Sequence, residues 1–129
     1  MTDEADSHSH YIVPELRSVD AWDRTDPVDP QNFELAVQAI IGPMGEKGEE
    51  IFYLTVCTPQ WLANYVSREK YIFGIHRLIV ERYNWDLIED VVRRLCRRIS
   101  GKSWQEVTTK LNRFAGWEYE DYEECPLLP

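Results

Sequence analysis

The sequence predicts a single α+β domain, in which about three helices pack on one face of an antiparallel sheet of about four strands. Three observations predict this fold. Segments with strand periodicity come first along the chain, and segments with helical periodicity follow. A glycine-rich loop joins two of the strand-like segments, as in a hairpin. The chain has 129 residues, of which 43% are hydrophobic, so it can bury one core of ordinary size.

The first predicted elements are strands. Residues 11–19 (YIVPELRSV) predict a strand, and Pro14 places it at an edge because proline cannot donate to a ladder. Residues 20–32 contain two prolines and four aspartates, which predicts a loop. Residues 51–58 (IFYLTVCT) are rich in β-branched and aromatic residues and predict another strand. Before this strand, residues 32–41 carry an apolar side chain at every second position. This pattern predicts a strand with one apolar face, made of Phe33, Leu35, Val37, Ala39 and Ile41.

The next two predicted elements are a short helix and a strand. Thr58 and Pro59 have the residue types of an N-cap and a first helical turn, so a helix is expected over 59–68. Residues 75–83 (IHRLIVERY) are apolar on both faces of a predicted strand. We therefore expect that strand to be central in the sheet.

Two longer helices are predicted next. Asn84 is placed to cap a helix whose apolar residues recur at helical spacing, and Gly101 is expected to end it. Ser103 and Glu106 have the spacing of a capping box and predict the start of a third helix. We expect an acidic N-terminal tail over 1–10, one domain over 11–124 and a C-terminal tail over 125–129.

The net charge limits the possible classes of partner, and the cysteine content indicates the cellular compartment. The formal net charge is −9, which disfavours nucleic acid and favours a basic partner. The three cysteines have no C-x-x-C spacing, which indicates a reducing compartment. Residues 1–10 are unlike a secretory signal, and no apolar run has the length of a membrane span. A soluble, cytoplasmic protein without a membrane partner is therefore expected.

The loop GPMGEKGEE, residues 42–50, is the candidate ligand-binding motif. A glycine loop that cradles a phosphate normally opens a helix, whereas this loop leads into a strand. Glu46, Glu49 and Glu50 would also oppose a bound anion. The loop is therefore interpreted as a hairpin connection whose glycines supply positive φ angles. Its acidic tip is at the same time a candidate docking surface.

No catalytic arrangement is evident, so the protein is not expected to be an enzyme. No cofactor or metal site is predicted. His76 is interpreted as a hydrogen-bonded core residue of the central strand. The run RRLCRR (93–98) follows acidic residues at four-residue spacing, which favours a solvated helix face. A basic patch used in self-association is the alternative.

The segment WEYEDYEE (117–124) interleaves large aromatic residues with acids. Aromatic anchors beside carboxylates are typical of protein-binding surfaces aimed at Arg and Lys. The alternative is that the aromatic residues dock the segment onto the third helix while the acids are merely solvated. Together with the loop, this segment supplies the candidate partner-binding residues, which are Glu46, Glu49, Glu50, Trp117, Glu118, Tyr119, Glu120, Asp121 and Tyr122.

Four segments resemble the immunity protein 8 family of bacterial polymorphic toxin systems. They are IIGPMGEKGEEIFYLTVCTPQWL (40–62), FGIHRLIVERYNWDLI (73–88), SWQEVTTKLNRF (103–114) and WEYEDY (117–122). The resemblance covers residues 11–122. It implies a small cytoplasmic, non-enzymatic inhibitor that binds and neutralises a cognate toxin domain. It supplies no map of the residues that contact the toxin.

The acidic charge is consistent with a basic toxin, such as a nuclease, because complementary charge speeds capture. Two other functions stay open at this point. One is a small adaptor or self-associating structural protein, and the oligomeric state is open between monomer and homodimer. The other is a hydrolase that uses a glutamate or His76, although no residue spacing supports it.

Overall fold

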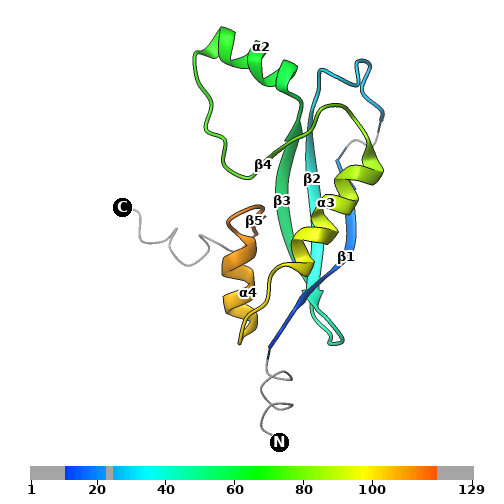
Figure 1. Cartoon of the computed structure of the whole chain (residues 1–129), viewed down its shortest axis with the longest axis vertical. Helices are drawn as coiled ribbons and strands as arrows, with labels where there is room; N and C mark the ends of the chain where they lie inside the picture. Colours follow the sequence, from blue (N-terminus) through cyan, green and yellow to red (C-terminus); the bar gives the residue numbers. More distant parts are fainter. Residues whose placement is uncertain (1–10, 23–24, 119–129) are drawn as a thin grey trace, which may run out of the picture.

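The computed structural model describes residues 11–22 and 25–118, and it confirms the α+β class (Figure 1). A five-stranded sheet has the order β1-β2-β3-β4, and a fifth strand also pairs with β3. The elements, in chain order, are β1 (Pro14–Ala21), β2 (Glu34–Pro43), β3 (Glu50–Cys57), α2 (Pro59–Glu69), β4 (Arg77–Ile79), α3 (Trp85–Arg97), α4 (Trp104–Leu111) and β5 (Gly116–Trp117).

The β2–β3 hairpin forms the centre of the sheet. Its two strands are antiparallel, with Val37 opposite Leu54 and Ala39 opposite Phe52. The alternation predicted for β2 is confirmed, because Val37, Ala39 and Ile41 are buried under the helices and the residues that alternate with them are more exposed. The hairpin therefore supplies one apolar face to the core.

β1 is an edge strand, as Pro14 predicts. Among the described strands it pairs with β2 alone, antiparallel, and the register shifts between Leu16 and Ser18. This irregularity sets Arg17 apart from the regular alternation of the strand. Arg17 returns below as the residue that holds the glycine loop.

The prediction of a central strand over residues 75–83 is wrong. β4 has three residues, pairs in parallel with β3 and ends the strand order. His76, at φ 53°, interrupts the extended backbone before β4. After β4 the chain turns away, and the Tyr83 amide donates to the carbonyl of Pro30 at 2.7 Å. The sheet is thus mixed, although most of its pairings are antiparallel.

The predicted helix starts are confirmed by their caps. The side chains of Thr58, Asn84 and Ser103 accept from the amides of Trp61, Leu87 and Glu106, respectively. The Glu106 carboxylate accepts from the Lys102 amide at 2.9 Å, one residue before the position that a capping box requires. This hydrogen bond, aided by Lys110, lowers the pKa of the Glu106 carboxyl.

The prediction that Gly101 ends the second helix is wrong. α3 ends at Arg97, and Arg98 is its C-cap. Gly101 instead forms an isolated bridge with Ile12, in which the amide of each residue donates to the carbonyl of the other at 2.7 and 3.0 Å. This bridge ties the start of the described chain to the α3–α4 connection.

α3 and α4 lie over one face of the sheet (Figure 1), and the core fills the space between the layers. Ile88, Val92 and Cys96 of α3 and Val107 and Leu111 of α4 are buried there. α2 differs, because it projects past the end of β3 and none of its residues is buried (Figure 1). None of the helices in the described residues is long and apolar enough to cross a membrane.

Candidate functional site

Glu50 sits between two tryptophans. It is the first residue of β3 and pairs with Ile41, so its side chain points to the face that the helices cover. One carboxylate oxygen accepts from the Trp104 indole at 3.0 Å, and the other accepts from the Trp117 indole at 2.6 Å. All three side chains are half-buried. We call these three residues the Glu50 clamp, since they join β3, α4 and β5.

β5 extends the clamp along the backbone. Trp117 pairs with Phe52 of β3, and its amide donates to the Asn112 side chain at 2.7 Å. The Glu118 amide donates to the Ile51 carbonyl at 3.0 Å. Trp117 is therefore docked beside α4, while the Glu118 side chain is exposed. Tyr119, Glu120, Asp121 and Tyr122 lie outside the described residues.

Arg17 holds the glycine loop against β1. Its Nη2 donates to the carbonyls of Pro43 and Glu46, each at 2.8 Å. Its guanidinium also lies 3.3 Å from the Glu15 carboxylate and 3.9 Å from the Glu49 carboxylate. The loop is thus tied down through its backbone, and the Glu46 and Glu49 side chains face solvent.

The loop glycines serve two different purposes. Gly45 and Gly48 have φ angles of 77° and 105°, which confirms that they supply positive φ. Gly42 is needed for a different reason, because a Cβ there would meet the Gly48 carbonyl and lie 2.6 Å from Arg17 Nη2. The loop runs from β2 into β3, so it lacks the helix N-terminus that a phosphate-cradling loop uses.

The predicted site residues therefore separate into two groups. Glu50 and Trp117 meet in the clamp, whereas Glu46 and Glu49 lie at the tip of the hairpin. No sequence pattern indicates that Trp104 or Arg17 belongs to these groups. Neither could be found from local patterns, because Trp104 lies 54 residues from Glu50 and Arg17 lies 26 residues from Pro43.

His76 and the two described cysteines are the groups that bear on possible chemistry. Nε2 of His76 donates to the Asn112 carbonyl at 2.6 Å, which confirms the predicted hydrogen bond. The prediction that His76 is a core residue of a strand is wrong, because it is half-buried and lies just before β4. Cys57 and Cys96 are free and buried, and burial raises the pKa of Cys96 to about 11. A thiol with that pKa is protonated at neutral pH and is a weak nucleophile. Within residues 11–22 and 25–118, no group of three or more His, Cys, Asp or Glu could hold a metal ion.

The arginine run of α3 is ion-paired along the helix. Arg93 contacts Glu89 at 3.2 Å, and Arg94 contacts Asp90, both at four-residue spacing. These pairs are the ones that the sequence predicted for a solvated helix face.

A second group of side chains extends from the sheet onto α2. Arg77 of β4 binds the Glu34 carboxylate at 3.0 Å and lies 5.4 Å from the Trp61 ring centroid. Trp61 in turn stacks on Tyr65 at 5.2 Å, one helical turn further along α2. Arg68 lies 5.7 Å from the Tyr65 ring. These contacts anchor the first half of α2 to the sheet through cation–π and ring stacking.

The comparison with known families places the chain among the immunity proteins. The family model described as Immunity protein 8 matches residues 14–122, which is most of the chain. The protein therefore belongs to the immunity protein 8 family, and the partner that this family implies is a toxin. No curated protein and no solved structure gives a significant match to the chain.

Proposed function

We propose that the protein neutralises one cognate toxin domain by binding it stoichiometrically in the cytoplasm of the producing cell. The observation that carries this proposal is the family match over residues 14–122. Inhibition through binding requires no catalytic group on the inhibitor. The protonated, buried Cys96 and the hydrogen-bonded His76 are consistent with a protein that performs no chemistry of its own.

The distribution of charge supports a basic toxin surface, such as the substrate groove of a nuclease. Residues 85–113, which contain α3 and α4, hold seven of the 14 basic residues but only four of the 23 acidic ones. The negative charge is therefore concentrated on the strands, their loops and the tails. A basic partner would be attracted to that side of the molecule and would bind faster there.

The exposed carboxylates of Glu46, Glu49 and Glu118 support the proposal as rim contacts of the toxin. Glu50 has a different role, because both of its oxygens accept hydrogen bonds within the protein. We therefore assign Glu50 to the folding of the site rather than to toxin contact. We assign the same structural role to Trp117, because its indole N–H donates to Glu50.

Co-expression tests the proposed function. The toxin domain encoded beside this gene would be induced in cells that carry this protein, an unrelated acidic domain of similar charge, or an empty vector. We expect survival with this protein to exceed that with either control by at least about 100-fold, because a tight complex leaves little free toxin. Survival equal to that with the acidic control would refute specific neutralisation.

A further inference from the structure

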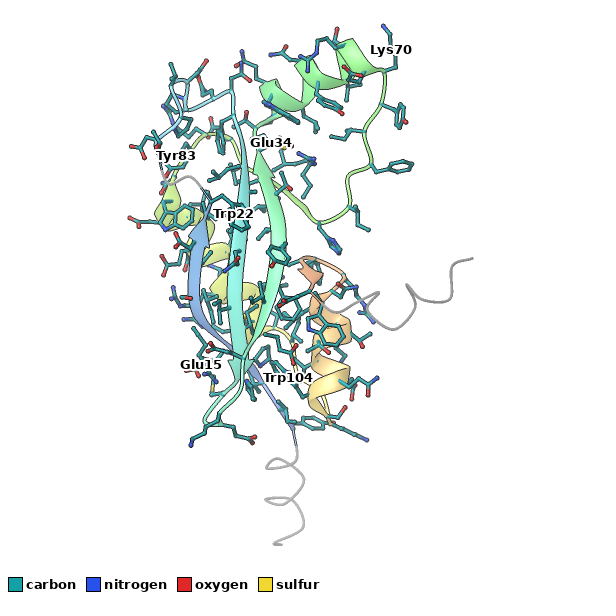
Figure 2. All side chains as sticks on the ribbon, turned by 180° about the vertical axis from the view of Figure 1, so that it is seen from behind. Glu15, Trp22, Glu34, Lys70, Tyr83 and Trp104 are labelled. Carbon is teal, nitrogen blue, oxygen red and sulfur yellow. The ribbon has the colours of Figure 1, made fainter. Side chains whose placement is uncertain are left out.

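The face of the sheet opposite α3 and α4 is open in the described part of the chain, and its centre is apolar. Figure 2 views the molecule from this side, with the strands in front of α3 and with α4 beside β3. The cross-strand pairs on this face include Ile40 with Ile51 and Gln38 with Tyr53. An antiparallel sheet that meets water on one face usually alternates to polar residues there. We call this surface the open face; its β2 and β3 residues are Ala36, Gln38, Ile40, Ile51, Tyr53 and Thr55.

α2 does not cover the open face, although its place in the chain would allow it. It lies in the crossover between the parallel strands β3 and β4, and crossover helices usually pack on their sheet. Here α2 buries none of its residues and ends at Lys70, which has a φ of 80°. Beyond the contact between Trp61 and Arg77, the helix and the segment after it stand away from the strands (Figures 1 and 2).

Exposed apolar side chains continue from the open face toward α2. Ile79 of β4 is 52% exposed, and Tyr71 and Phe73 in the segment after α2 are 67% and 79% exposed. The rings of Tyr71 and Phe73 pack edge to face at 5.8 Å, so they present one aromatic surface. Exposed apolar surface that is larger than single scattered side chains is typical of binding sites.

Acidic side chains border the open face along β1 and at both ends of the sheet. Asp20 pairs with Gln38 and Glu15 pairs with Gly42, which places both acids on the same face as Gln38. Glu34 lies toward the opposite end of the sheet from Glu15 (Figure 2). The opposite side of the molecule carries the arginines of α3. Two of these acids are ion-paired, Glu15 with Arg17 and Glu34 with Arg77. The open face is thus an apolar centre bordered by acidic residues, of which Glu15 and Glu34 share their charge with arginines.

We propose that the open face is the surface that docks the toxin, and that it takes a toxin domain with an apolar contact centre and a basic rim. This inference rests on the proposed function. Tyr53 anchors the apolar centre, because large exposed side chains at the middle of an interface carry most of its binding energy, and Ile79 extends the apolar surface at the β4 edge. Glu15 and Asp20 face the basic rim. A second copy of this chain is a poorer occupant, since a face-to-face pair would oppose the acids of both copies.

The test introduces arginines into the centre of the open face. Ala36→Arg combined with Tyr53→Arg would oppose a basic toxin and block close contact, while both positions are exposed and remove no core contact. Leu87→Arg, at a 39%-exposed position on α3, is the control on the other side of the sheet, and it is matched in charge to the single variant Ala36→Arg. Calorimetry with a catalytically inactive toxin domain should show binding at least about 100-fold weaker for the double variant. The control should bind like the wild type, and the melting temperatures of all three proteins should agree within about 5 °C.

Each alternative outcome overturns the proposal in a distinguishable way. Wild-type affinity in the double variant would move the docking surface elsewhere and leave the proposed function intact. No binding by the wild-type protein would reject the proposed function and this inference with it. A wild-type dimer that the double variant dissociates in sedimentation would identify a second copy as the occupant. If the double variant unfolds, Ala36→Arg alone decides the same question.

Discussion

Replacing Glu50 with alanine should lower the free energy of unfolding by about 2 kcal/mol, because it removes the shared acceptor of two indole N–H groups. A hydrogen bond to a charged group is stronger than a neutral one, and the half-buried indoles of Trp104 and Trp117 would lose their charged partner. For a domain of this size, the melting temperature should fall by roughly 5–10 °C. Thermal and denaturant unfolding measure both quantities.

Two comparisons separate the stability that the clamp hydrogen bonds contribute from the effect of removing a carboxylate in general. Glu49→Ala removes an exposed neighbour and should change stability by less than about 0.5 kcal/mol. Trp117→Phe removes one indole donor, so a double-mutant cycle with Glu50→Ala should give a coupling energy of about 1 kcal/mol. If Glu50→Ala unfolds like Glu49→Ala, the clamp contributes nothing to folding and Glu50 returns to the list of candidate toxin contacts.

Adding one methyl group at Gly42 should destabilise the protein by about 2–3 kcal/mol, because the new Cβ has no room. It would meet the Gly48 carbonyl and lie 2.6 Å from Nη2 and 2.8 Å from Cζ of Arg17. Relief requires both the Gly48 backbone and the Arg17 side chain to move, and the two hydrogen bonds of Arg17 to the loop backbone would be disrupted. Gly42→Ala should therefore loosen the whole loop as well as lower the melting temperature.

Gly74→Ala is the matched control for this substitution. No heavy atom lies within 4 Å of a Cβ at Gly74, and its φ is outside the positive region. The added methyl group should be neutral or stabilise slightly, by restricting the unfolded chain. Equal unfolding midpoints for Gly42→Ala and Gly74→Ala would show that the packing between Arg17 and the loop has no energetic weight.

The parts of the fold that the sequence predicts correctly depend on near neighbours. A helix N-cap is a local signal, because its side chain accepts a hydrogen bond from the backbone amide only three residues later. Thr58, Asn84 and Ser103 could therefore be recognised as helix starts. Alternation over ten residues indicates the buried face of β2, because strand side chains alternate strictly. The glycine loop could be recognised as a hairpin connection because the segments on both sides of it each have the residue pattern of a strand.

The parts of the structure that differ from the sequence-based predictions depend on contacts between segments that are distant along the chain. β4 is apolar on both faces, yet Leu78 faces the core and Ile79 is exposed, so its hydrophobicity does not mean that it is central. Nothing near Gly101 indicates that Ile12 pairs with it. The Glu50 clamp joins positions 54 and 67 residues apart, and a single sequence carries no signal for such a meeting. The open face, likewise, becomes visible only once α2 is seen to leave it uncovered.

Titration of toxin activity with the purified protein tests the central claim most directly. A fixed concentration of active toxin domain, well above the dissociation constant of the complex, would be assayed at increasing ratios of this protein. We expect activity to fall linearly and to vanish near one equivalent, because a stoichiometric binder removes one toxin for each molecule added. Full toxin activity at about tenfold excess, with the inhibitor folded by its melting curve, would contradict neutralisation by binding.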